Sequence, residues 1–230
     1  MKRANSSIIA AGVFTLALLW ATKSRAAADP WGDVVSWSPD GDWWPAPDPG
    51  PDPDPDHEGE PMNGTPAYLG AFLYMIQSAE TGAAAVATGD AYHMLYGGNV
   101  FGSLADHPAN LGWPGVKLPE RMCRAAGFGP GCVSTAAGAF QIIKPTWNRV
   151  RKAGGWGPHL PDFGPESQDE AGRRLLIECG ALPLIERGDF DGALRRAAPV
   201  WASLPGSTAQ QGPKTRAEVY ALYSSALGVA

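Results

Sequence analysis

The sequence contains few of the residues that build metal and nucleic-acid sites. It has 3 Cys and 4 His in 230 residues, and neither a Cys-x-x-Cys nor a His-x-x-x-His spacing occurs. This excludes the usual zinc sites, and we expect neither a metal ion nor an organic cofactor. Lys and Arg number 18 against 23 Asp and Glu, without a clustered basic face, so we expect no nucleic-acid partner.

The N-terminal apolar run is short for a membrane span. It covers residues 8–21, whereas a spanning helix needs about 20 apolar residues. A basic start precedes the run, and three alanines at 26–28 resemble a signal-peptide cleavage site. We therefore predict that residues 1–28 export the chain to the periplasm or the exterior. Lys23 and Arg25 behind the run leave an alternative, an uncleaved anchor in the inner membrane.

Acidic residues are concentrated in one segment. Residues 29–60 hold 10 of the 23 acidic residues and no Lys or Arg, whereas residues 61–230 hold 13 acidic and 14 basic residues. Proline alternates with Asp, Gly and Ala at 45–55, which favours an extended chain. We predict an acidic linker at 29–64. Its four tryptophans can dock on the domain, lie at a membrane interface or stack on sugars: Trp31, Trp37, Trp43 and Trp44.

Cys123 and Cys132 flank a loop with several Gly and Pro residues. Such a loop can bring the two sulfur atoms together, and an oxidising compartment would let them pair. We predict this disulfide and a free thiol at Cys179, which lies in an apolar helical stretch. Three cysteines allow three single pairings, and three reduced cysteines are the alternative.

The spacing of apolar residues predicts a helix near the start of a folded domain at 65–230. Apolar residues at positions 69, 72, 73 and 76 follow the i, i+3, i+4, i+7 pattern, and Gly82 is a typical stop. The region from about 89 to 138 is rich in Gly and Pro. There, Gly97-Gly98 lies between two short β-like pieces and predicts a hairpin turn.

Helices are expected again in the C-terminal half. Pro145 precedes a helix over 147–151, and Ser167 and Glu170 have the spacing of a capping box. Apolar residues at positions 190, 194, 197 and 201 form a further helical stripe. Helices around a small hairpin lobe predict an α+β fold, mainly helical, with a cleft between its lobes.

Glu80 closes the first predicted helix, on the same face as its apolar residues. A carboxyl group in apolar surroundings resists ionisation, so its pKa rises. With a pKa near the working pH, such a group can donate a proton to a substrate and later take one back. The alternative is a glutamate at a helix end that points to water.

A second motif, Gly-Ala-Phe-Gln-Ile, occupies residues 138–142. Gly138 permits a tight turn or a close approach to a ligand, Phe140 can stack under a sugar ring, and Gln141 can form hydrogen bonds with hydroxyl or N-acetyl groups. The alternative is an ordinary turn that leads into the core.

In this order, with a Gly-rich lobe between them, the two motifs resemble the lysozyme-like superfamily, and within it the family of the bacteriophage lambda lysozyme, a lytic transglycosylase. The similarity runs from about residue 67 to residue 206. It includes Ser-Ala-Glu-Thr-Gly at 78–82 and several specific runs in the second half: Ser134–Gln141, Ser167-Gln168-Asp169, Gly180-Ala181-Leu182-Pro183 and Trp201–Gly206.

The resemblance implies roles for individual residues. Glu80 would be the general acid and base. The glycan cleft would be lined by Thr135, Ala136, Phe140 and Gln141, and also by Tyr92 and Asp106. For Asp106, stabilisation of the hairpin lobe is an equal alternative, and His107 is expected to be a loop hydrogen-bonding residue.

The resemblance also implies a reaction: cleavage of the β-1,4 bond between N-acetylmuramic acid and N-acetylglucosamine of peptidoglycan, in which the substrate's own 6-hydroxyl attacks and leaves a 1,6-anhydro end. One alternative is a hydrolytic muramidase that uses Asp90 or Asp106 to activate water. Another is a non-catalytic, glycan-binding envelope protein. We expect glycan strands as the partner and a monomeric protein.

Overall fold

The structure, a computed structural model, describes residues 65–125, 128–207 and 213–229. The predicted export segment 1–28 and linker 29–64 lie outside these residues and stay predictions. Across the described part of the chain, no helix is both long and apolar enough to cross a membrane.

The described residues are mainly helical. Two short strands, β1 (Val116–Lys117) and β2 (Val133–Ser134), pair antiparallel, with Val116 opposite Ser134 and Lys117 opposite Val133. This composition confirms the predicted α+β class. The helices are α1 (Thr65–Thr81), α2 (Ala83–Thr88), the 3₁₀ helix η1 (Asp90–His93), α3 (Glu120–Ala125), α4 (Lys144–Val150), α5 (Pro165–Glu178), α6 (Leu182–Glu186), α7 (Phe190–Ala197) and α8 (Arg216–Leu227).

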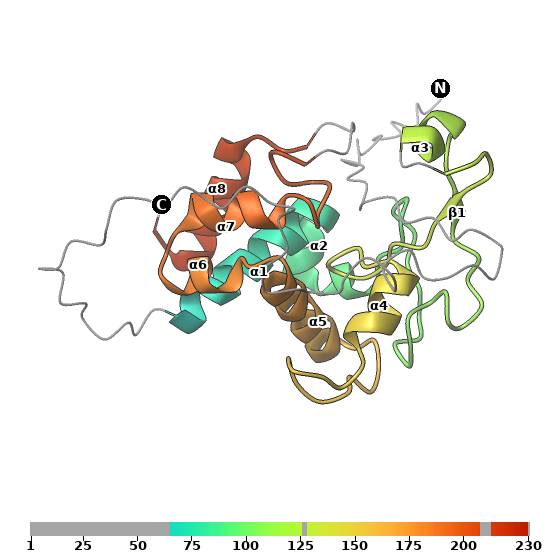
Figure 1. Ribbon diagram of the computed structural model, residues 1–230, viewed down its shortest axis with the longest axis horizontal. Coiled ribbons are helices and arrows are strands. Elements are labelled where there is room, and N and C mark those ends of the chain that lie inside the picture. Colours follow the sequence, from blue (N-terminus) through green and yellow to red (C-terminus); the bar gives the residue numbers. More distant parts are fainter. Residues whose placement is uncertain (1–64, 126–127, 208–212, 230) are drawn as a thin grey trace, which may run out of the picture. The chain divides into compact units, whose positions relative to one another are not determined.

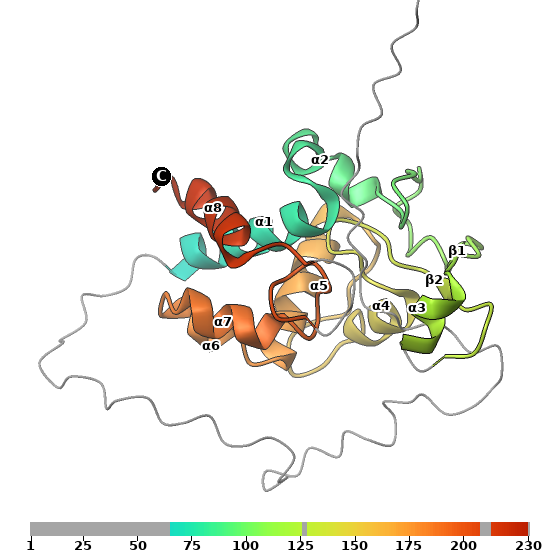
Figure 2. The same ribbon diagram turned by 90° about the horizontal axis from the view of Figure 1, so that it is seen from above.

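Helix α1 is the centre of the packing. It contacts α2, α5, α6 and α8, and Figure 2 shows α8 beside it. In both views α6, α7 and α8 lie at one end, and α3 with the paired strands lies at the other. The C-terminal half of α1, which carries Glu80, therefore lies between the helical end and the strand end.

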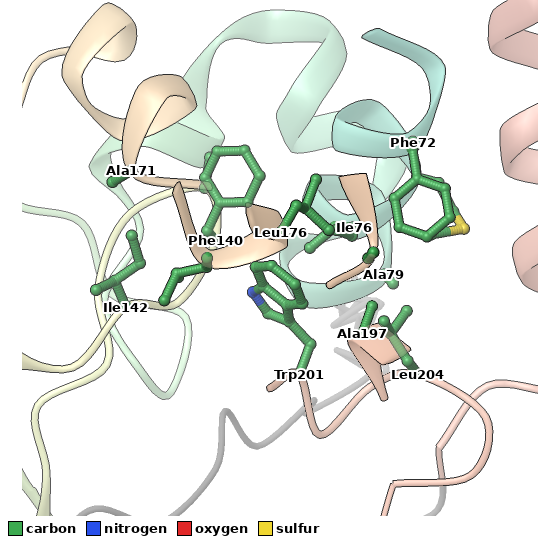
Figure 3. Close-up of a cluster of buried hydrophobic side chains, with 14 of the residues drawn as sticks. Phe72, Ile76, Ala79, Phe140, Ile142, Ala171, Leu176, Ala197, Trp201 and Leu204 are labelled. Atoms are coloured by element: carbon green, nitrogen blue, oxygen red, sulfur yellow. The ribbon is translucent and has the colours of Figure 1, made fainter. Parts of the chain in front are cut away.

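The core forms around the apolar face predicted for α1. Phe72, Met75, Ile76 and Ala79 are all at most 1% exposed. Figure 3 shows Ile76 and Ala79 in one cluster with Phe140 and Trp201, which come from distant parts of the chain. Trp201 lies beyond the end of α7 but is still buried, so the predicted apolar stripe reaches past its helix.

The predicted hairpin turn is present, but not as paired strands. Leu95 N–H donates to Asn99 O at 2.6 Å, and Met94 and Val100 form an isolated antiparallel bridge. The two-stranded sheet occurs further along the chain, at β1 and β2, where no alternation of apolar and polar residues marked it. Strands of two residues are too short for a periodic signal.

The predicted capping box at Ser167 is wrong. Helix α5 begins two residues earlier, at Pro165, a residue favoured in the first turn. Ser167 therefore lies inside the helix, where its Oγ donates to Asp162 Oδ1 at 2.9 Å. Glu170 binds two arginines of its own helix instead of a backbone N–H. A capping box does occur at α8, between Thr215 and Glu218.

Candidate active site

Glu80 is a buried carboxyl group at the last turn of α1. Its side chain is 4% exposed, and burial raises its pKa from 4.5 to about 7. Two hydrogen bonds from Ser203 and the charge of Lys214 oppose this rise, but more weakly. A carboxyl group with a pKa near 7 can be protonated when substrate arrives and ionised afterwards, which acid–base catalysis requires.

The segment after α7 covers Glu80. Ser203 Oγ donates to Glu80 Oε1 at 2.6 Å, and Ser203 N–H approaches the same oxygen at 3.4 Å. Sequence reasoning missed this serine, because a contact across 123 positions leaves no local pattern. The resemblance of residues 201–206 to the family indicated that this segment matters, but not that Ser203 binds Glu80.

The segment at 138–142 has an unusual backbone. Gln141 has φ +46°, and it is the one non-glycine residue in the left-handed region among those the structure describes. Gly138 has φ +75°, and a Cβ there would lie 2.1 Å from Gln168 Oε1, so the turn requires glycine. Strained non-glycine residues concentrate at functional sites. The turn therefore remains part of the candidate site.

Phe140 does not face a ligand. Its side chain is 1% exposed, and its ring packs in the core (Figure 3). The backbone of α5 lies close beside the ring at Gly172. The predicted sugar-stacking role is therefore wrong. From the sequence, a phenylalanine next to a turn could either stack under a sugar or pack in the core. The close approach of α5 to the ring places Phe140 in the core.

Three neighbouring side chains also serve the protein interior. Thr135 Oγ1 accepts from Lys144 N–H at 3.0 Å at the start of α4. Gln141 Nε2 donates to Gly138 O at 3.0 Å, within its own turn. Ala136 is fully buried beside Ile143, so its predicted cleft-lining role is wrong. These residues hold the turn in shape.

Tyr92 belongs to a polar cluster that the sequence did not reveal. Its hydroxyl donates to Asp169 Oδ1 at 2.9 Å, and Gln77 Nε2 donates to the same oxygen at 2.7 Å. Burial and the nearby carboxylate raise the pKa of Tyr92 to about 12, and burial raises the pKa of Asp169. Gln77 lies one turn before Glu80 on α1, so the cluster adjoins the helix that carries the acid.

Asp106 is a structural acceptor. Its Oδ1 accepts from Trp147 Nε1 at 2.8 Å, from His107 N–H at 2.7 Å and from Asn110 Nδ2 at 3.1 Å, and Arg151 lies 2.7 Å away. These donors hold its pKa below the usual range despite partial burial. Of the two predicted roles, the contacts favour stabilisation of the lobe.

His107 is a neutral, buried hydrogen-bonding residue. Its Nε2 lies 2.9 Å from Ile142 O, and its Nδ1 accepts from Ala109 N–H at 3.2 Å. Burial lowers its pKa to about 4. Nε2 therefore carries the proton, and the ring links the 106–109 loop to the end of the 138–142 motif.

Comparison with known proteins identifies the family. The family model described as Endolysin matches residues 70–230. The chain belongs to the endolysin family. It is 30% identical over 175 residues to the endolysin of Escherichia phage P2, covering 74% of this chain and 98% of that protein. It is 37% identical over 116 residues to the endolysin of Escherichia phage lambda, covering 50% of this chain and 62% of that protein.

Solved structures agree with this family. The bacteriophage lambda lysozyme complexed with a chitohexasaccharide matches with a TM-score of 0.53 and 30% identity, over 70% of this chain and 94% of that one. A second structure of the lysozyme from bacteriophage lambda matches with a TM-score of 0.52 and 28% identity. The predicted lysozyme-like fold and the predicted resemblance are confirmed.

A disulfide lies in the strand end of this family member. The structure joins Cys123 of α3 to Cys132. Cys132 directly precedes β2, and the 135–141 segment follows β2 in the chain. Cys179 is a free, partly buried thiol, and burial raises its pKa to about 11. Within the described residues, no group of three or more His, Cys, Asp or Glu side chains could hold a metal ion.

Proposed function

We propose that the chain is an exported glycosidase that degrades peptidoglycan, with Glu80 as its general acid and base. Membership of the endolysin family supports a lysozyme-type activity on peptidoglycan. The observation that carries the assignment to Glu80 is its burial at the end of α1, which raises its pKa to about 7. In its protonated form this group can serve the leaving oxygen of a glycosidic bond.

The proposed reaction is lytic transglycosylation. Glu80 gives its proton to the oxygen between N-acetylmuramic acid and N-acetylglucosamine, and the bond from that oxygen to the muramic C1 breaks. The 6-hydroxyl of the same muramic residue then bonds to C1 and passes its proton to the Glu80 carboxylate. The products are a 1,6-anhydro-muramic end and a new N-acetylglucosamine hydroxyl end, and Glu80 is restored for the next cycle.

The surroundings of the other carboxylates favour this route over hydrolysis. A hydrolase needs a second carboxylate as nucleophile or water activator. Asp106 is bound by several donors of its own lobe, and Asp169 accepts from Tyr92 and Gln77. Asp90 is exposed and accepts from Thr88 Oγ1 at 2.8 Å. All three carboxylates already accept hydrogen bonds from neighbouring residues of the protein.

Digestion of purified cell-wall sacculi tests the reaction. We expect wild-type protein to release fragments whose muramic ends carry the 1,6-anhydro group, identified by mass spectrometry. Reducing muramic ends without the anhydro group would instead establish a hydrolase. Glu80→Gln, which cannot donate a carboxyl proton, should release no fragments. Wild-type protein that binds sacculi without cleaving them would support the non-catalytic alternative.

Export and monomeric action on glycan strands are part of the same proposal. The disulfide between Cys123 and Cys132 supports an oxidising compartment, where such bonds persist. The basic start and the apolar run of the first 28 residues support passage through the inner membrane. Intact mass measurement of the protein recovered from periplasm and from membranes distinguishes cleavage from a retained anchor.

A further inference from the structure

The contact between Ser203 and Glu80 is directional. Ser203 Oγ lies 2.6 Å from Glu80 Oε1, and Ser203 N lies 3.4 Å from the same oxygen. A backbone N–H can only donate, so Oε1 is placed as an acceptor. In a protonated carboxyl group one oxygen carries the proton and the other accepts. The two donors of Ser203 therefore favour the protonated form in which Oε1 is the accepting oxygen.

Ser203 is itself held firmly in place. It is fully buried, and so are its neighbours Ala202 and Leu204. Its carbonyl oxygen accepts from Lys214 N–H at 3.0 Å, and Leu204 N–H donates to Trp201 O at 3.1 Å. Trp201 and Leu204 both belong to the main core cluster (Figure 3). Because packing fixes both sides of the serine, its hydroxyl is a rigid reference point for the carboxyl group.

We propose that Ser203 is a positioning residue for the general acid: it holds Oε1 of Glu80 as a hydrogen-bond acceptor, so that Oε2 carries the proton that is transferred. This inference rests on the proposed role of Glu80 as the acid. It assigns to the segment after α7 a role in the orientation of that acid.

The proposal has a signature in the pH dependence of the reaction. The bonds from Ser203 favour the ionised carboxylate, and the charge of Lys214 acts in the same direction. Among the residues that the structure describes, Lys214 is the charged group whose field lowers the pKa of Glu80. Loss of the serine hydroxyl should raise the pKa of Glu80 further. Activity requires the protonated acid, so the loss of activity on the alkaline side of the pH profile (the alkaline limb) should move to higher pH.

Ser203→Ala removes the hydroxyl with little change in volume. We expect the alkaline limb of sacculus digestion to move up by about one pH unit, from the strength of a hydrogen bond to a charged group. We also expect a slower rate on the acid side, where Glu80 is protonated in both proteins, because the proton is no longer confined to Oε2. Ser203→Thr keeps a hydroxyl and should restore the wild-type limb.

Ser167→Ala is the matched control. Ser167 is also buried and donates to a carboxylate, Asp162 Oδ1, but on α5. We expect no shift of the limb in this variant. A purely structural effect of removing a buried serine would lower activity in both variants without moving either limb.

Titration of the Glu80 carboxyl carbon by NMR gives a readout independent of activity. The resonance is assigned by its absence in Glu80→Gln. A folded Ser203→Ala protein with the wild-type limb and the wild-type Glu80 pKa would overturn the proposal. If this variant does not fold, Ser203→Cys, which keeps the side-chain volume but replaces the hydroxyl by a weak donor, takes its place. Wall lysis by Glu80→Gln would instead refute the proposed function, and the titration would still report on Ser203.

Discussion

Gly172 of α5 lies against the ring of Phe140, and this contact can be tested by adding a single methyl group. A Cβ at position 172 would lie 2.8 Å from two atoms of the ring, closer than real contacts allow. Overpacking of a core costs roughly 1–3 kcal/mol. The ring cannot retreat easily, because Phe140 is 1% exposed within the main core cluster.

Gly70 of α1 provides the matched control. It also lies inside a helix, it is exposed, and a Cβ there would meet no atom within 4 Å. Gly70→Ala should stabilise the protein by about 0.5–1 kcal/mol, because alanine favours the helix. Gly172→Ala has the same gain in helix propensity, but its new methyl group also clashes with the ring of Phe140. The difference between the two variants therefore isolates the clash, at roughly 1–3 kcal/mol.

The assay is urea denaturation followed by circular dichroism, with the disulfide kept oxidised. Gly172→Ala should have a lower midpoint than wild type, and Gly70→Ala a higher one. Combining Gly172→Ala with Phe140→Leu should recover part of the loss, because leucine is smaller than phenylalanine. Equal stability of the two alanine variants would show that the ring does not pack on α5 as described, and would reopen the sugar-stacking role.

Three further predictions concern stability. Replacing Cys123 and Cys132 by serine should lower the free energy of unfolding by about 2–3 kcal/mol, from the entropy of a short closed loop, whereas Cys179→Ser should have little effect in the same melts. The pKa of His107 is lowered to about 4 in the folded state, so its share of stability should be lost as the pH falls from about 6.5 to 4, and His107→Gln should lack this pH dependence in urea titrations. The pKa of Glu80 is raised to about 7, so its charge is disfavoured in the folded state. Glu80→Gln should therefore be more stable than wild type by up to about 3 kcal/mol above pH 7, and this gain should vanish below about pH 4, where the glutamate is protonated in both states. An equal gain at both pH values would show that ionisation is not the cause.

Local patterns predicted the parts of the site that depend on local chemistry. Apolar spacing placed Glu80 at the end of a helix and on its buried face, which is where the structure has it. Ser203 could not be predicted in the same way, because its position beside Glu80 depends on how the segment after α7 folds back over α1. In the sequence, a serine between apolar residues is equally typical of an ordinary turn and of a residue that binds the acid.

The incorrect predictions have a common physical cause. Phe140 and the supposed capping serine Ser167 each have chemistry that suits two environments. For Phe140 the close approach of α5 at Gly172 selects the core, and for Ser167 the earlier helix start at Pro165 selects a bond to Asp162. Each choice is made by a tertiary neighbour or by a competing helix start, which the motif itself does not contain.

The contact of Ser203 with Glu80 also has a consequence for the order in which the chain is made. A polypeptide is synthesised from its N-terminus, and the acid leaves the ribosome long before the segment that covers it. Since 123 positions separate the two residues, this contact cannot form until residue 203 has emerged. A chain that is still being synthesised therefore carries its glutamate without the serine that orients it.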